Sequence, residues 1–354
     1  MTDSVLKIGL LGCGTIAQFA HLPALAKVRS ARLTAICDGA EDLLTTVGKA
    51  QGVKDLYTDY AEFLEKADIE AVIIAAPDEF HIPLSMQALD AGKHVLVEKP
   101  LGVNARECES LIEKLRQTRL KLQVGSMKRH DPGITFSHRH IKESLGPILS
   151  ISGWYRDTLF RPALQETLLP PVITSEHAVK PSTDPKCDIE HYSLITHGAH
   201  LFDILRYLGG EVNGVTTNHA FKFNQHSWHG LLEFDHGGIG NFELTVKVNS
   251  DWSEGYVIHG EHGSVEIKTF VPFYYRPSEV RIFDARSEEW HTPLCAHSNP
   301  YKRQIEAFAH AVRSDGPVNP DAHDGLATVS LIEAVEAASK SGKRQEIINL
   351  KNVR

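Results

Sequence analysis

The N-terminal third of the chain alternates between short apolar runs and longer segments in which apolar residues recur every three or four positions. The short runs predict buried strands over residues 6–12, 31–38, 70–77, 94–100 and 121–127. The periodic segments predict helices over residues 15–27, 40–52, 80–92 and 104–118. Strands and helices that alternate at this spacing indicate a parallel sheet with helices on both faces. We therefore predict an α/β domain of the Rossmann type over residues 1–125.

The pattern changes after residue 126, where β-rich runs are separated by Gly, Pro, Asn and Asp. Strands are expected over residues 148–156, 212–223, 227–235, 238–248, 254–261, 263–270 and 279–286, and helices return over 300–314 and 323–342. This predicts a second, α+β domain over residues 126–354. The proline-rich stretch between Trp154 and Tyr192 is weakly periodic, and loops of this length in compact domains are usually functional or disordered. Because it lies between an expected strand and a histidine-containing helix, we expect it to cover a bound ligand, with an inert surface excursion as the alternative.

Composition narrows the class of protein. A length of 354 residues suits two domains, and a net charge of −8 argues against a nucleic-acid groove, which needs an excess of Lys and Arg. No stretch approaches the roughly 20 apolar residues that cross a bilayer, and the N-terminus lacks a signal-peptide pattern, so we expect a cytoplasmic protein. The five cysteines are scattered without a CxxC pair, which predicts neither a disulfide framework nor a structural zinc site.

A glycine motif lies directly between the first expected strand and the first expected helix. Gly12 permits a tight turn, Gly14 lets the backbone approach a pyrophosphate, and Ala17 lets the helix pack close to the strand. The helix start at Thr15 and Ile16 presents unpaired amide groups to the phosphates. In this context the motif predicts a dinucleotide site, although an ordinary glycine turn remains the alternative.

Asp38 ends the second expected strand, 21 residues after Ala17. A carboxylate at this position accepts hydrogen bonds from an adenosine ribose and repels a 2′-phosphate. The sequence therefore favours NAD over NADP as the cofactor.

Two further motifs follow expected strands of the first domain, at the sheet edge where ligands bind. Ala75 and Pro77 are followed by His81, and Glu98, Lys99 and Pro100 follow the next strand. Together with the glycine motif, and with "MKRHDPG" and "THGAHLFDILRYLGG" later in the chain, this order resembles the glucose–fructose oxidoreductase, inositol dehydrogenase and MocA (Gfo/Idh/MocA) family of NAD(P)-dependent oxidoreductases.

The resemblance implies a fold and a reaction. It implies that the second domain is built on a large, mostly antiparallel open sheet, through which such proteins form homodimers or homotetramers. It also implies that a small carbohydrate or cyclic polyol binds between the domains and passes hydride from a secondary alcohol to NAD. Residues of the first domain that the resemblance assigns to the cofactor are Ala76, Pro77, His81, Glu98 and Lys99, with Lys99 also catalytic.

Members of this family commonly carry an Asp and a His four residues apart, with the His acting as acid or base. In this chain His200 takes the position of the His, but Thr196 stands where the Asp is expected, and His197 is the natural replacement candidate. The proton acceptor is therefore His200 or His197. We expect Asp203 to pair with Arg206, its neighbour one helical turn later.

The candidate substrate-binding residues are Thr196 and three arginines. An arginine can hold an anionic group by paired hydrogen bonds, although a surface salt bridge is the alternative use. The arginines are Arg129, Arg156 and Arg161.

Two other functions stay open at this point. The tripeptide Thr196–His197–Gly198 is similar to NAD-dependent glycosidases, which oxidise a sugar transiently, eliminate the leaving group, add water and reduce again. A non-catalytic NAD-sensing regulator would need neither Lys99 nor histidines in the second domain. We expect no metal site, because the histidines at 138 and 140 and in the β-rich region (His219, His226, His229 and His236) lack a Cys or carboxylate partner at ligand spacing.

Overall fold

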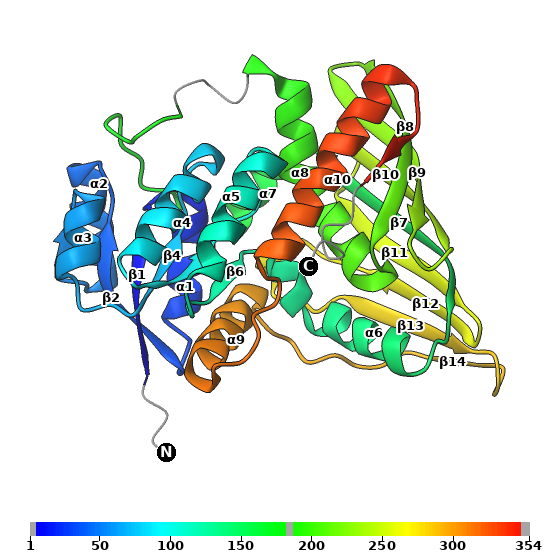
Figure 1. Ribbon diagram of the computed structural model, residues 1–354, viewed down its shortest axis with the longest axis horizontal. Coiled ribbons are helices and arrows are strands. Elements are labelled where there is room, and N and C mark those ends of the chain that lie inside the picture. Colours follow the sequence, from blue (N-terminus) through cyan, green and yellow to red (C-terminus); the bar gives the residue numbers. More distant parts are fainter. Residues whose placement is uncertain (1–4, 182–186, 348–354) are drawn as a thin grey trace. The chain divides into compact units, whose positions relative to one another are not determined.

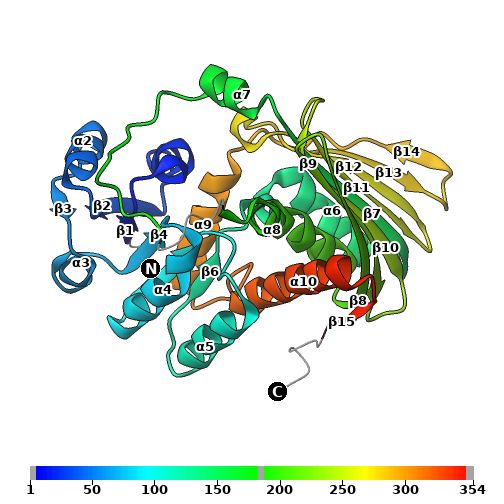
Figure 2. The same cartoon turned by 90° about the horizontal axis from the view of Figure 1, so that it is seen from above.

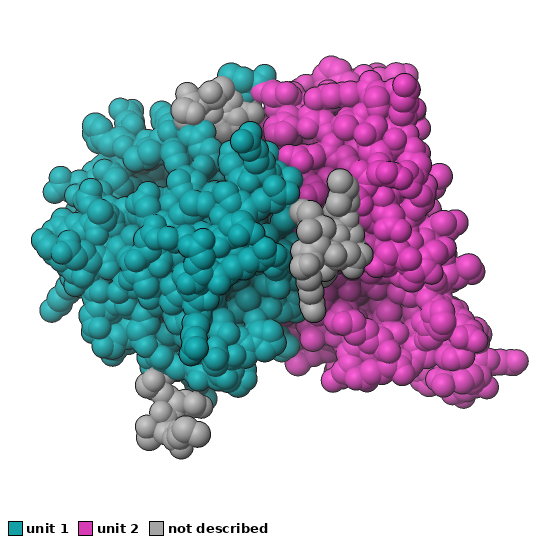
Figure 3. All heavy atoms as spheres, in the orientation of Figure 1, with its two compact units in different colours: residues 1–126, 169–187, 301–326 teal, residues 127–168, 188–300, 327–354 magenta. Residues whose placement is uncertain are grey.

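The computed structural model describes residues 5–181 and 187–347. The chain forms two compact units, which Figure 3 shows in different colours. The first unit contains residues 1–126, 169–187 and 301–326, and the second contains residues 127–168, 188–300 and 327–354. The first boundary lies one residue from the division expected from sequence, but two later stretches return to the first unit.

The first unit is built on a six-stranded parallel sheet, as the alternating pattern predicts (Figure 1). Its strand order is β3-β2-β1-β4-β5-β6, the doubly wound order of dinucleotide-binding domains. The central strands are apolar on both faces because helices cover both sides of the sheet. The strands are β1 (Leu6–Leu11), β2 (Ala31–Cys37), β3 (Asp55–Tyr57), β4 (Ala71–Ile74), β5 (His94–Val97) and β6 (Leu122–Val124).

The helices of the first unit differ from expectation in two places. The expected first helix is a π-helical turn, η1 (Ala17–His21), followed by α1 (Leu22–Leu25), and the Leu22 amide bonds to the Ala17 carbonyl. Sequence periodicity also missed β3 and the short α3, which hold too few apolar residues to produce a pattern. The remaining helices are α2 (Glu41–Gln51), α3 (Tyr60–Lys66), η2 (Asp78–Phe80), α4 (His81–Asp90), α5 (Ala105–Arg116) and α9 (Pro300–Ser314).

The returning stretch 301–326 is bound to β6 and to Glu70, the residue that precedes β4. The Val124 amide at the end of β6 donates to the Pro320 carbonyl at 3.0 Å. Arg313 of α9 forms a bidentate pair with Glu70 at 2.6 and 2.7 Å. The first unit is therefore completed by residues that lie almost 200 positions after the last strand of its sheet.

The second unit is built on a nine-stranded sheet in which only β7 and β10 pair in parallel. The expected mostly antiparallel open sheet is thus confirmed. Its order is β14-β13-β12-β11-β7-β10-β9-β8-β15. The strands are β7 (Ile148–Thr158), β8 (Val212–Lys222), β9 (Gln225–Phe234), β10 (Ile239–Val248), β11 (Ser253–Gly260), β12 (Gly263–Lys268), β13 (Glu279–Asp284), β14 (Glu289–His291) and β15 (Gln345–Glu346).

Helices cover one face of this sheet and leave the other face open (Figures 1 and 2). Phe202 of α8 packs edge-on against Phe242 of β10, with ring centroids 4.9 Å apart. Gly153 of β7 admits Leu205, since a Cβ there would lie 2.7 Å from the leucine side chain. The helical elements are η3 (Met127–His130), α6 (Pro132–Glu143), α7 (Arg161–Leu168), α8 (Ile189–Gly209), η5 (Pro272–Tyr274) and α10 (Ala322–Ser341).

Among the described residues, no helix is long and apolar enough to cross a membrane.

Candidate functional site

The glycine motif forms the turn between β1 and η1. Gly12 has a φ of +94°, and a Cβ at this position would lie 2.6 Å from the backbone oxygen of Ala75. A Cβ at Gly14 would meet no atom within 4 Å. The fold therefore requires glycine at position 12, whereas Gly14 faces open space of the kind that a pyrophosphate needs.

Asp38 closes this turn from the end of β2. One carboxylate oxygen accepts from the Cys13 amide at 2.7 Å and the other from the Ala40 amide at 2.9 Å. Each oxygen has a second lone pair, so the carboxylate can still accept hydrogen bonds from a ribose. At the adjoining helix start Thr15 is exposed and Ile16 is half-buried. These residues fit the adenosine and phosphate groups of NAD.

His81 connects the loops that follow β4 and β5. Its ring is fully buried, with Nδ1 2.7 Å from the Pro100 oxygen and Nε2 2.9 Å from the Ala76 oxygen. Ala76 and Pro77 are half-buried. His81 therefore holds the two loops in place and would act on a cofactor only through them.

Glu98 occupies a buried position beside Lys99. Oε1 of Glu98 lies 2.8 Å from Nε2 of His21, and Oε2 accepts from the Lys99 amide at 3.2 Å. Burial raises the pKa of Glu98, but the hydrogen bond and charge of His21 and the charge of Lys99 outweigh it, so that the pKa falls below its ordinary value. Lys99 is half-buried, and its Nζ makes no hydrogen bond to any described residue.

A segment that we name the strap, residues 169–181, runs along the first unit (Figure 2). Gln18 and Ile173 exchange two hydrogen bonds, of 2.8 and 2.9 Å, and Ser175 donates to Asp42 at 2.7 Å. Val179 lies 2.9 Å from where a Cβ of Gly39 would be. The described part of the proline-rich loop thus contacts residues next to the glycine turn and Asp38. Residues 182–186 of that loop lie outside the described residues.

The second unit presents the predicted histidines on α8, opposite β7. His197 Nδ1 lies 2.9 Å from the Ser193 oxygen, and Nε2 lies 3.2 Å from Oδ2 of Asp157. Both partners are hydrogen-bond acceptors, so both ring nitrogens are engaged. Thr196, at the position of the expected Asp, has a buried Oγ1 without a partner in the described part of the chain.

Asp157 is the centre of a charged group. Nε of Arg161 donates to Asp157 at 2.7 Å, and Nη2 of the same guanidinium donates to the Tyr155 hydroxyl at 3.0 Å. Burial raises the pKa of Asp157, but the hydrogen bond and charge of His197, together with Arg161, lower it further than burial raises it. Asp157 is therefore a carboxylate held between the His197 imidazole and the Arg161 guanidinium.

His200 lies over the ring of Tyr155. Their planes are 6° from parallel and their centroids are 6.2 Å apart. The Lys128 ammonium lies 4.7 Å from the centroid of the same ring and pairs with the buried Glu254. Burial raises the pKa of Tyr155 to about 12. We call Lys128, Tyr155, Asp157, Arg161, His197 and His200 the His200 cluster.

Arg129 is paired with Asp203, a carboxylate that is not part of this cluster. Its guanidinium makes hydrogen bonds of 2.7, 3.0 and 3.1 Å to Asp203, and both side chains are buried. The expected pair of Asp203 with its helical neighbour is thus replaced by a pair with Arg129, and Arg206 instead bonds Glu211 at 2.8 Å. One edge of the guanidinium, formed by Nε and Nη2, is taken up by a buried carboxylate, so we leave Arg129 out of the proposed substrate site.

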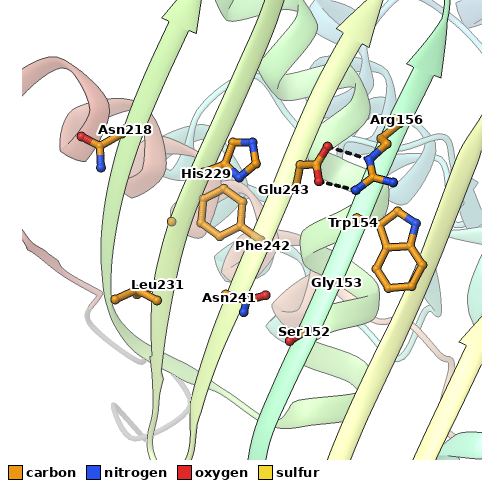
Figure 4. Close-up of a pocket in the computed structure, with 11 residues that line it drawn as sticks. Ser152, Gly153, Trp154, Arg156, Asn218, His229, Leu231, Asn241, Phe242 and Glu243 are labelled. Carbon is orange, nitrogen blue, oxygen red and sulfur yellow. Dashed lines mark hydrogen bonds and ion pairs between the residues drawn. The ribbon is translucent and has the colours of Figure 1, made fainter. Parts of the chain in front are cut away.

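Arg156 lies on the opposite, open face of the sheet (Figure 4). Adjacent residues of a strand point to opposite faces, so Arg156 points away from Tyr155 and Asp157. It forms hydrogen bonds of 2.5 and 2.7 Å with Glu243. The pair lines a hollow of 460 Å³ together with Trp154, His229 and Asn241. Arg156 therefore has no place beside His200.

Sequence reasoning missed Asp157 and Lys128. The alternation of β7 was a usable signal for Asp157, since it puts a carboxylate on the face that also carries the apolar Ile151 and the buried Tyr155. Lys128 and Arg129 are neighbours in a short 3-10 turn, and the sequence alone did not distinguish which of the two faces the histidines.

Each unit of the chain contains a region that matches a domain of a known protein family. The domain described as "Oxidoreductase family, NAD-binding Rossmann fold" of the GFO_IDH_MocA family matches residues 6–126, and its "C-terminal alpha/beta domain" matches residues 193–347. The chain is 26% identical to an inositol 2-dehydrogenase of Rubrobacter xylanophilus, over 98% of this chain and 94% of that protein. It is 25% identical to a scyllo-inositol 2-dehydrogenase (NAD(+)) of Bacillus subtilis, over 94% and 93%.

Solved structures show the same fold. A levoglucosan dehydrogenase in complex with NADH superposes with a TM-score of 0.80 at 19% identity, over 97% of this chain and 99% of that one. An NAD-binding oxidoreductase from Klebsiella pneumoniae gives a TM-score of 0.81 at 18% identity, over 98% and 100%. With matching domains over both units and the glycine turn and Asp38 in place, this chain belongs to the Gfo/Idh/MocA family of NAD-dependent oxidoreductases.

Proposed function

We propose that the protein oxidises one secondary hydroxyl of a sugar, a sugar derivative or a cyclic polyol, with His200 as the proton acceptor. The relatives above are named as inositol dehydrogenases, and a structural neighbour is named as a levoglucosan dehydrogenase. These substrates share a ring that carries secondary alcohols. When bound, NAD supplies the hydride acceptor.

We choose His200 over His197 because both ring nitrogens of His197 already lie at hydrogen-bond distance from protein oxygens. Ser193 and Asp157 occupy both ring nitrogens of His197, so this ring has no nitrogen left for a substrate hydroxyl in the described arrangement. His200 is half-buried, and its ring lies parallel to that of Tyr155. We assign proton transfer to His200 and a positioning role to His197, which Asp157 holds in place.

Lys99 is proposed to donate a hydrogen bond to the same hydroxyl oxygen. An ammonium group stabilises the alkoxide character that develops as hydride departs, and general acid–base groups of this kind contribute about 10²–10⁴ in rate. The carboxylate of the preceding residue, Glu98, accepts a hydrogen bond from the Lys99 amide. This bond helps to fix the backbone from which the lysine side chain extends. Arg161, Thr196 and Lys128 are proposed substrate contacts.

Absorbance of NADH distinguishes the proposed reaction from the glycosidase alternative. The purified protein with NAD is incubated with inositols, free sugars and aryl glycosides, and NADH is measured beside released aglycone. Stoichiometric NADH supports the dehydrogenase, whereas aglycone without net NADH contradicts it. The named relatives do not favour a glycosidase.

On the substrate found in this way, Lys99→Met and His200→Asn should each lower kcat at least about a hundredfold. His197→Asn should lower it by roughly tenfold, since it removes only the support of the cluster. His229→Asn, an exposed histidine on β9, is the control and should retain normal turnover. Equal losses for His197→Asn and His200→Asn would contradict the assignment of roles.

A second copy of the chain is the proposed occupant of the open sheet face. Leu231 and Ile239 are 60% and 61% exposed there, and the Arg156–Glu243 pair beside them offers charges of both signs to an identical partner. Light scattering should show a homodimer or homotetramer, and Leu231→Asp with Ile239→Asp should give a monomer. A wild-type monomer at micromolar concentration would contradict this assignment.

A further inference from the structure

Three side chains with metal-ligating atoms meet near the β8–β9 hairpin, where α8 begins. They are His219 of β8, His226 of β9 and Glu190 in the first turn of α8, and one donor atom from each lies within 4.8 Å of the other two. Nε2 of His219 is 3.1 Å from Nδ1 of His226, and Oε1 of Glu190 is 3.5 Å from Nδ1 of His219. No carboxylate stands at ligand spacing from these histidines along the strands, but in the folded chain Glu190 of α8 supplies one.

The two imidazole rings are held in fixed orientations. His219 is paired with Trp228 across β8 and β9, and their rings stack with centroids 4.6 Å apart. The planes of His219 and His226 differ by 3°, and Phe221 packs on His226 with centroids 4.5 Å apart. Rings that neighbouring aromatics lock in place are preorganised ligands, because little side-chain freedom is left to lose on binding.

His226 carries a polar atom that the surrounding protein does not satisfy. The side chain is 4% exposed, and its Nε2 has no hydrogen-bond partner among the described residues. The nitrogen of His226 that faces His219 is Nδ1, so the ring can give Nδ1 to an ion while Nε2 keeps the proton. Glu190 is half-buried at the rim, which leaves the group open to solvent on one side.

We propose that Glu190, His219 and His226 form a binding site for a divalent transition-metal ion, with Zn²⁺ as the best match. Two imidazoles and a carboxylate are a donor set that zinc accepts in four-coordinate sites, with water in the remaining position. The 3.1 Å between the two histidine nitrogens is close to the roughly 3.3 Å that separates two ligands about 2.0 Å from one tetrahedral ion. Each histidine contributes one lone pair, and the glutamate contributes its charge.

The proposed ion would join the start of α8 to two strands of the sheet. None of its three ligands belongs to the His200 cluster or to the cofactor turn. The inference thus goes beyond the proposed function, and binding of the ion can be measured without any substrate or turnover. A bound ion stabilises the folded state by an amount that grows with the logarithm of its concentration relative to its dissociation constant.

Equilibrium dialysis of the full chain against ZnCl₂, after removal of metal with a chelator, tests the site. Mass spectrometry of the metal should find one zinc per chain in the wild type, and the melting temperature should rise with zinc concentration. His219→Ala and Glu190→Gln should each weaken binding by at least about tenfold. The matched control is His229→Ala, on the same strand as His226 but exposed, which should bind zinc like the wild type.

Two measurements keep the test decisive if a variant is unstable. Glu190→Gln changes a half-buried side chain by one charge and keeps its shape, and its fold is checked by circular dichroism without metal. Co²⁺ in place of zinc reports the ligands directly, because a tetrahedral site with bound histidine gives strong visible absorption. No zinc on the wild type at roughly tenfold excess, or unchanged affinity in both His219→Ala and Glu190→Gln, overturns the proposal.

Discussion

Nε2 of His21 lies 2.8 Å from Oε1 of Glu98, and both side chains are closed off from solvent. His21 ends the π-helical turn that follows the glycine motif, and Glu98 precedes Lys99. The contact therefore links the turn that would hold the pyrophosphate to the loop that carries the proposed catalytic lysine.

His21→Ala should destabilise the protein because it leaves a carboxylate buried without its partner. Removal of one member of a buried pair costs about 3–5 kcal/mol, and the melting temperature at pH 7 should fall by roughly 5–10 °C. Scanning calorimetry measures the change. His21→Gln, which keeps a hydrogen-bond donor, is the control and should lower the melting temperature by less than His21→Ala does.

The same pair predicts a pH dependence. The pKa of Glu98 in the folded protein lies below its ordinary value of 4.5, so its contribution to stability is complete above about pH 4.5 and is lost as the pH falls through the folded pKa. The difference in melting temperature between the wild type and His21→Ala should therefore shrink at acidic pH. A difference that stays constant from pH 7 to pH 3.5 would contradict an ionised Glu98.

Gly12 and Gly14 should respond differently to the same substitution. Gly12→Ala forces a side chain into a left-handed conformation and against the Ala75 oxygen, so the melting temperature without cofactor should fall by several degrees. Gly14→Ala meets no atom of the protein and should leave that melting temperature unchanged.

NADH titration completes this comparison. Gly14→Ala should weaken NADH binding by at least about tenfold, since its methyl group fills the approach to the pyrophosphate. A Gly14→Ala variant with wild-type affinity would place the phosphates elsewhere.

Asp38→Asn should change the choice between the two nicotinamide cofactors. The substitution removes the negative charge that repels a 2′-phosphate and keeps one oxygen to accept from the Cys13 or Ala40 amide. The ratio of the dissociation constants for NADPH and NADH, measured by fluorescence, should fall by about tenfold. An unchanged ratio would remove Asp38 from the ribose site.

Gln18→Ala should release the strap. Both hydrogen bonds between Gln18 and Ile173 are lost, and only the contacts of Ser175 and Val179 remain among those described above. Limited proteolysis should then cut residues 169–181 faster by several-fold, because cleavage follows the population of the open form. Thr46→Ala, an exposed helix position, should leave the cleavage rate unchanged.

The sequence predicts the folds better than the sites. Parallel strands buried on both faces, such as Ala71–Ile74, and the alternating β7 leave signals that need no knowledge of distant residues. Pairings across the chain leave no such signal. Asp203 is bound by Arg129, 74 residues away, although its helical neighbour Arg206 was the local expectation.

The same limit applies to the candidate sites. Because Thr196 stands where an Asp is expected, the sequence suggested His197 as a replacement. The carboxylate that contacts the His197 ring belongs to Asp157 of β7, 40 residues earlier in the chain. Glu190 likewise reaches His219 from a helix, so a search for ligand spacing along the strands did not find it. Local patterns determine elements, whereas these partners depend on how the elements pack.

The return of residues 301–326 to the first unit affects how the protein can be synthesised and folded. The Rossmann sheet emerges from the ribosome first, yet the partners of Val124 and Glu70 are Pro320 and Arg313. A nascent chain of residues 1–126 therefore exposes surfaces that remain uncovered until more than nine-tenths of the polypeptide has been translated. Domains usually fold one after another from the N-terminus, but here completion of the first unit has to wait for nearly the last codons.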